Sequence, residues 1–218
     1  MPSEPVVDSP HAHPFGNMKY VIQDKSFGYV LLTWFIMGFA NLWTLPLRVD
    51  YITAPEWGIE GSAIFVAMII TIIPETMRMI LIPLWASLFD KMNFVLLRMI
   101  LNLFFGFGVL LFFITSKPWV IGFGSALIGA AFAGGSIAWN LWVTKYAPSG
   151  KTGAYMSVHV CLTGIRGTIG PILGYWTVSL IGAQNIGILS FAMMIFATLM
   201  LIPEIQHGKK TTSKSKSL

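Results

Sequence analysis

Six long apolar stretches dominate the chain, interrupted only by isolated polar side chains. A helix of about 20 apolar residues crosses a hydrocarbon layer about 30 Å thick. The short segments between the stretches carry charged residues, Pro and Gly, which are typical of turns. The pattern therefore predicts an all-α, polytopic membrane protein with six transmembrane helices, at residues 27–49, 61–86, 93–115, 118–143, 154–180 and 184–203.

The segments outside these stretches are polar and define the predicted domain boundaries. Residues 1–26 are expected to form a cytoplasmic tail that ends in a juxtamembrane segment, without a signal peptide. Residues 27–203 form the predicted six-helix transmembrane domain, and residues 204–218 a basic cytoplasmic tail. Very short turns join the third stretch to the fourth and the fifth to the sixth, so each pair is expected to be antiparallel.

Composition supports a membrane protein and narrows the function classes. Of the 218 residues, 55% are hydrophobic and 11% are charged, whereas a soluble domain carries about 25% charged residues. The single cysteine, Cys161, predicts no disulfide framework, and the four scattered His predict no metal site. No cofactor is expected.

The distribution of Lys predicts the orientation in the membrane, because positively charged loops stay cytoplasmic. With the N-terminus inside, nine Lys lie on the cytoplasmic side, against Lys117 and Arg48 on the outer side. We therefore expect both termini in the cytoplasm of a multi-pass protein of the cell (inner or plasma) membrane. The net charge of +5 is then a topology signal and an attraction to anionic lipids, and no nucleic-acid partner is expected.

Two charged residues, Glu75 and Arg78, lie near the middle of the second stretch. A charge at that depth costs on the order of 2.5–3.5 kcal/mol, so it is expected to face protein, a partner charge or water. The spacing of three places both on one helix face. One interpretation is an ion pair that only neutralises itself, and the other is a site that lines a cavity.

Polar side chains recur at helical spacing in three further stretches, which favours the cavity. The first, fourth and fifth stretches each carry such a stripe, although Asn and Ser also join helices without binding a ligand. The third and sixth stretches are more apolar, and Arg98 in the third is expected to reach the cytoplasmic head groups. We therefore expect the first, second, fourth and fifth helices to surround a polar path, with the third and sixth facing lipid. The stripes contain Trp34, Met37, Asn41, Thr44, Arg48, Ser125, Phe132, Ser136, Asn140, Tyr155, His159, Thr163 and Arg166.

These polar residues suggest roles in binding a small-molecule solute. Arg78 and Arg166 are candidates to attract an anionic or zwitterionic solute, and Asn41 and Asn140 to orient it by hydrogen bonds. Glu75 is a candidate for proton coupling. Two mid-membrane Arg against one Glu leave spare positive charge, which favours organic anions.

His159 is a further candidate for proton coupling, but a lone His on a helix is more often simply hydrogen-bonded.

Two segments resemble motifs of the major facilitator superfamily. The loop "ASLFDKMNF" (86–94) resembles the family's turn between the second and third helices, in which Asp90 and Lys91 match the acidic and basic positions. The family's Gly is replaced by Ala86. The fifth stretch contains "GPILG" (170–174), which is similar to the family's glycine–proline pattern, with Tyr175 replacing its last Gly.

The resemblance covers one six-helix half of such a transporter, most like the C-terminal half. It implies secondary active transport by alternating access, with gating by Asp90, Lys91, Gly170, Pro171 and Gly174. Family members have two halves, so it also implies a homodimer, a second six-helix half, or a chain cut from a longer transporter. Within the half, the second and fifth helices would be equivalent, and Glu75 would face Arg166.

Two alternatives belong to other classes. An intramembrane serine protease would need Ser125 and His159 to meet, but they are predicted near opposite membrane faces, so the chain is not expected to be an enzyme. A non-transporting membrane partner or assembly protein derived from a half-transporter stays open.

Overall fold

A computed structural model describes residues 14–206, and over this range the chain is helical without strands, so the all-α prediction is confirmed for the described residues. The predicted tails at 1–13 and 207–218 lie outside the described residues. The helices are α1 Pro14–Asn17, α2 Lys19–Gln23, α3 Lys25–Thr44, α4 Leu47–Thr53, α5 Ala63–Ala67, α6 Ile73–Lys91, α7 Phe94–Phe113, α8 Pro118–Leu141, α9 Thr152–Ile181 and α10 Ala183–Met200. Single turns lie at η1 Pro55–Trp57, η2 Met68–Ile72, η3 Trp142–Lys145 and η4 Ile202–Glu204.

Five helical segments of the described range are long and apolar enough to cross a membrane. The fifth predicted stretch corresponds to α9, which is not among these five although it has 30 residues. Its His159, its Arg166 and several Gly and Thr residues lower its hydropathy. The five segments are Lys25–Thr53, Ala63–Lys91, Phe94–Phe113, Pro118–Trp139 and Ala183–Glu204.

Local sequence signals explain where the helices begin and break. Asp24 accepts a hydrogen bond from the backbone N–H of Phe27 at the start of α3, and Asn93 caps α7 through the N–H of Val95. The first predicted span breaks next to Pro46, where α3 ends and α4 begins, because proline lacks the N–H that a continuous helix needs. Between α5 and α6 the turn η2 is a π-helix.

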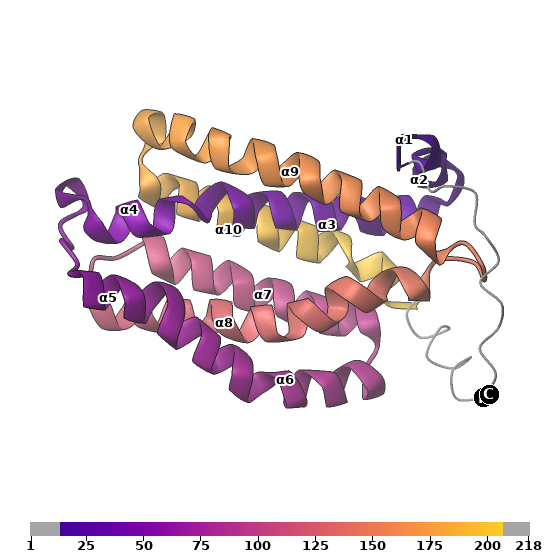
Figure 1. The fold of residues 1–218 in the computed structure, drawn as a ribbon, viewed down its shortest axis with the longest axis horizontal. Coiled ribbons are helices and arrows are strands. Elements are labelled where there is room, and N and C mark those ends of the chain that lie inside the picture. Colours follow the sequence, from indigo (N-terminus) through magenta and orange to yellow (C-terminus); the bar gives the residue numbers. More distant parts are fainter. Residues whose placement is uncertain (1–13, 207–218) are drawn as a thin grey trace.

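The helices run side by side along the long axis of the molecule (Figure 1). One group forms where α3 packs against α9 and α10, and a second where α8 packs against α6 and α7. The two groups meet where α7 packs against α10. The two groups have the same pattern of contacts: α3 corresponds to α8, α9 to α6 and α10 to α7, and each principal contact in one group has its counterpart in the other.

Glycine permits close approach in both groups. A Cβ atom on Gly174 of α9 would lie 2.5 Å from the carbonyl oxygen of Trp43 in α3. In the second group, a Cβ atom on Gly129 of α8 would collide with the backbone of Pro74 in α6. The sequence at these positions therefore sets the distance between the helix axes.

Burial differs from the expectation that the third helix faces outward. In the most apolar 18-residue stretch of α7, 56% of the residues are buried, whereas the corresponding stretch of the segment that contains α6 has only 11% buried. The reason is that α7 packs against both α8 and α10, whereas α6 has α8 as its main neighbour. The exposed face of α6 carries large apolar side chains, among them Met79 and Ile80.

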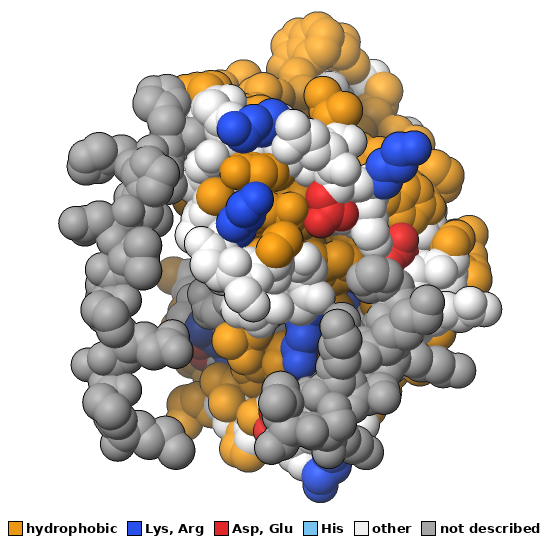
Figure 2. Space-filling model, turned by 90° about the vertical axis from the view of Figure 1, so that its right-hand side faces the viewer, with side chains coloured by type: hydrophobic (Ala, Val, Ile, Leu, Met, Phe, Trp, Pro, Cys, Tyr) orange, Lys and Arg blue, Asp and Glu red, His pale blue; other side chains and the backbone are white. Residues whose placement is uncertain are grey.

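Most of the described lysines gather at one end of the bundle. Five of the six described lysines belong to segments at the end that holds α1 and α2, where basic side chains stand out (Figure 2): Lys19, Lys25, Lys91, Lys145 and Lys151. The sixth, Lys117, directly precedes α8 at the opposite end.

Candidate functional site

A cavity of about 300 Å³ lies among α3, α6, α7, α8 and α9. It brings together three of the four predicted solute-binding residues, Asn41, Arg78 and Arg166. The fourth, Asn140, belongs to α8, but its side chain lies outside the described residues. The lining residues are Trp34, Met37, Gly38, Asn41, Leu42, Arg78, Arg98, Phe105, Phe132, Gly135, Ser136, Trp139, Thr163 and Arg166.

Arg166 reaches the cavity from α9 and is 6% exposed. Its Nη1 donates a hydrogen bond to the backbone carbonyl of Trp34, whereas its Nε has no hydrogen-bond partner. Gly38 makes room for the guanidinium group, because a Cβ atom there would overlap it. The glycine on α3 therefore allows a long cation on α9 to lie against the α3 backbone.

Arg98 is a site residue that the sequence prediction missed. It was expected to extend to the head groups, but it is 3% exposed and lines the cavity from α7. Its Cζ lies 3.5 Å from the centre of the Trp34 ring, and its Nη2 lies 3.2 Å from the sulfur of Met37. This cation–π contact favours the inward position. Trp34 and Met37 both belong to the predicted polar stripe of the first helix, which is the signal that could have identified a partner for Arg98.

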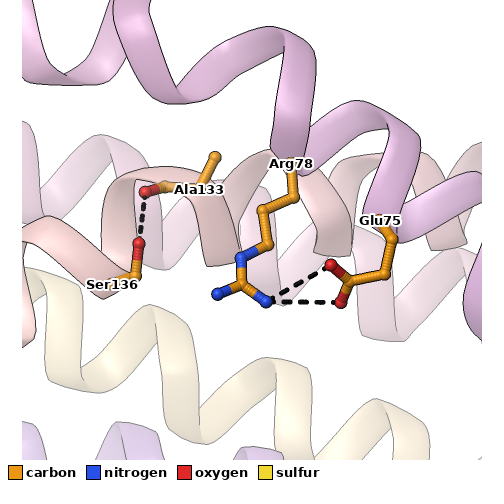
Figure 3. A network of polar contacts seen from close by, with 4 residues as sticks. All are labelled: Glu75, Arg78, Ala133 and Ser136. Carbon is orange, nitrogen blue, oxygen red and sulfur yellow. Dashed lines mark hydrogen bonds and ion pairs between the residues drawn. The ribbon is translucent and has the colours of Figure 1, made fainter.

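Arg78 and Glu75 form an ion pair, with 3.3 Å between Arg78 Nη1 and Glu75 Oε2. Figure 3 shows the Arg78 guanidinium between the Glu75 carboxylate and Ser136 of α8. Their side chains are 41% and 57% exposed, respectively, so the pair lies at the open side of the site. Both interpretations of the sequence, an internal ion pair and a residue that lines a cavity, therefore apply to Arg78, which pairs with Glu75 and lines the cavity.

Glu75 lines a second, smaller cavity of about 130 Å³, together with Arg48 and Ser125. Phe132 of α8 lines both cavities. The expectation that Glu75 faces Arg166 is therefore not met, because the two line different cavities and Arg166 turns to α3.

Asn41 connects the two cavities through a hydrogen bond. Arg48, which lines the smaller cavity, donates from Nη2 to Asn41 Oδ1 at 2.8 Å. One lone pair of the amide oxygen is thereby used, so Asn41 can offer a solute its amide N–H groups as donors and the second lone pair of its oxygen as an acceptor.

His159 is separated from the cavity by aromatic rings. It is 1% exposed, and its ring centre lies 4.1 Å from that of Trp139, 5.1 Å from that of Trp142 and 5.4 Å from that of Trp34. Its Nε2 has no hydrogen-bond partner. Proton coupling by His159 stays a prediction, and any proton would have to pass between these rings.

Ser125 and His159, the pair that a serine protease would need, lie far apart. Ser125 donates a hydrogen bond to the carbonyl of Ile69, in the π-helical turn before α6. Fourteen residues separate Ser125 from Trp139 along α8, which is about 20 Å at 1.5 Å per residue. Because His159 packs on Trp139, it lies too far from Ser125 to act as its base.

The predicted gating residues fall into two places. Gly170 and Gly174 lie where α9 approaches Leu42 and Trp43 of α3, and Pro171 lies within α9. Asp90 and Lys91 lie at the last turn of α6 and are exposed. Their roles in gating stay predictions.

The main cavity is electropositive. Arg78, Arg98 and Arg166 contribute three guanidinium groups, of which only Arg78 is paired with a carboxylate, that of Glu75, and no carboxylate occurs among the described lining residues. Arg98 and Arg166 are nearly fully buried, where an uncompensated charge is costly. The arrangement can therefore stabilise an anion.

No family model, curated protein or solved structure matches the chain.

Proposed function

We propose that the chain is a six-helix half of a membrane transporter that moves a small organic anion by alternating access. The observation that carries the proposal is the cavity that holds the nearly fully buried guanidinium groups of Arg98 and Arg166, with no carboxylate among its described lining residues. Arg78 also lines it, but that cation is paired with Glu75. In this proposal α9 also crosses the membrane, which brings the number of crossings to six, since its 30 residues span about 45 Å as a helix. The end rich in lysine faces the cytoplasm.

The contact pattern supports a moving part. Helices α3, α9 and α10 form one group and α8, α6 and α7 form the other, and exchanging the groups preserves the principal contacts. Such an internal repeat is typical of transporters that open alternately to each side, including the major facilitator superfamily. Phe132 lies between the larger and smaller cavities, where it would separate the two ends of the path.

A second six-helix half completes the proposed path. Helices α6 and α9 both line the cavity, and both expose large apolar side chains, such as Met79 and Trp176. A second copy of the chain, or a separate six-helix half, would cover these faces. The mass of the purified protein in nanodiscs distinguishes a dimer from a monomer.

The exposed α6 face also favours a second candidate, a non-transporting membrane partner. Only 11% of the apolar window that contains α6 is buried. In that function α6 would bind another membrane protein, and the cavity would be filled by side chains of that partner.

Uptake into liposomes tests the proposal. We expect purified protein to take up at least one radiolabelled carboxylate from a panel that includes lactate, succinate and benzoate. Arg166→Gln is expected to abolish uptake, while Lys117→Gln, which removes a cation at the far end of the bundle, is expected to leave it intact. Uptake of no member of the panel, or uptake that is insensitive to Arg166→Gln, would favour the non-transporting partner.

A further inference from the structure

We infer that the anion bound in the main cavity is an aromatic carboxylate, with its carboxylate group at Arg98 and Arg166 and its ring against the aromatic wall of α7 and α8. This inference rests on the anion site of the proposed function and adds the class of anion.

The two buried cations define the place of the carboxylate. Arg98 and Arg166 flank the same residue, because Arg98 lies over the Trp34 ring and Arg166 donates to the Trp34 carbonyl. Both guanidinium groups have N–H donors that could bind a carboxylate. Arg98 Nη2 contacts only the sulfur of Met37, which is a weak acceptor, and Arg166 Nε has no hydrogen-bond partner. A planar carboxylate can accept two hydrogen bonds from a guanidinium group.

The rest of the wall suits a ring. Phe105 and Phe132 line the cavity and meet edge to face, with 4.9 Å between their ring centres. Trp139 lines it on α8, 5.7 Å from the Arg166 guanidinium. Aromatic side chains attract another ring in edge-to-face or offset geometry beyond the gain from burial alone. An inorganic anion or a short aliphatic acid would leave this wall without a partner.

The volume limits the size of the anion. About 300 Å³ holds about ten water molecules at about 30 Å³ each. A single-ring carboxylate such as benzoate or phenylacetate fits within this volume.

Calorimetric titration of the full chain in nanodiscs tests the inference. The probes are benzoate, cyclohexanecarboxylate, which has the same charge and nearly the same size without aromaticity, and inorganic phosphate. We expect benzoate to bind about 2- to 12-fold more tightly than cyclohexanecarboxylate for each ring contact made. Equal binding of the two carboxylates, or tighter binding of phosphate, would overturn the inference.

Variants separate the carboxylate contact from the ring contact. Arg166→Gln should weaken benzoate binding about 10- to 150-fold, with partial recovery in Arg166→Lys. Phe132→Leu, at a residue that is 37% exposed and therefore tolerant of change, should keep carboxylate binding but reduce the preference for benzoate. If Phe132→Leu still prefers benzoate to the same degree and Arg166→Gln still binds benzoate with the same affinity, the anion binds elsewhere and the inference is overturned.

The outcomes also separate this inference from the proposed function. Uptake of aliphatic and aromatic carboxylates at equal affinity would overturn the inference and leave anion transport standing. Preferential benzoate binding without uptake would overturn transport and leave the inference standing. Binding of none of the three probes would overturn the inference.

Discussion

Replacing Gly174 by Ala should force α9 away from α3. The added Cβ would lie 2.5 Å from the carbonyl oxygen of Trp43, while unstrained contacts lie at about 3.5 Å, so the helices must separate by about 1 Å. The backbone of α3 cannot yield freely, because the indole N–H of Trp43 donates to Thr177 Oγ1 of α9 at 2.8 Å. One turn earlier, a Cβ on Gly170 would already be 3.0 Å from Leu42 Cβ.

A matched substitution on the same helix isolates this collision. A Cβ atom on Gly167, two turns earlier, meets nothing within 4 Å. Both substitutions gain about 1 kcal/mol of helix propensity, and only Gly174→Ala incurs about 1–3 kcal/mol of overpacking. At roughly 2–4 °C per kcal/mol for a chain of this size, Gly174→Ala should melt about 2–12 °C below Gly167→Ala.

The assay is thermal unfolding of both variants in one detergent, followed by circular dichroism of the helical signal. Anion uptake should also fall in Gly174→Ala, because Arg166 lies on the displaced helix, and should persist in Gly167→Ala. Equal melting temperatures for the two variants would refute the claim that the α3–α9 contact depends on glycine at position 174.

Three further predictions concern the cavities. Gly38→Ala should displace the Arg166 guanidinium and weaken benzoate binding about 10- to 150-fold, yet leave the melting temperature nearly unchanged because only the end of a flexible side chain moves; unchanged affinity in calorimetry would contradict this. Phe132→Ala should join the two cavities and speed efflux of trapped anion from liposomes, whereas wild-type efflux would mean that Phe132 does not separate them. Glu75→Gln should release Arg78 and tighten anion binding by at most about fivefold, since an exposed ion pair contributes little; weaker binding would assign Glu75 a direct role in binding.

The sequence predicted the positions of the cations along the helices better than their partners. Arg78 and Arg166 were expected in one polar region and both line the main cavity. Their immediate contacts were not predicted, because a spacing of three or four residues fixes a side chain's face on its own helix and says nothing of the neighbouring helix. Arg98 illustrates the limit: only the position of α3 beside α7 turns its guanidinium onto Trp34 instead of toward the head groups.

What the sequence determined by itself is the class of the protein and its elements. Long apolar stretches must become helices in lipid, because every backbone polar group has to be satisfied within its own segment, and Pro46, Asn93 and Gly182 mark where those helices break, begin and turn. The tertiary structure alone decided that α7 is more buried than α6, that Phe132 lies between two cavities, and that His159 is enclosed by tryptophan rings. These features depend on how closely helices distant in sequence approach one another, and that distance is set by pairs such as Gly174 with Trp43, which no single segment encodes.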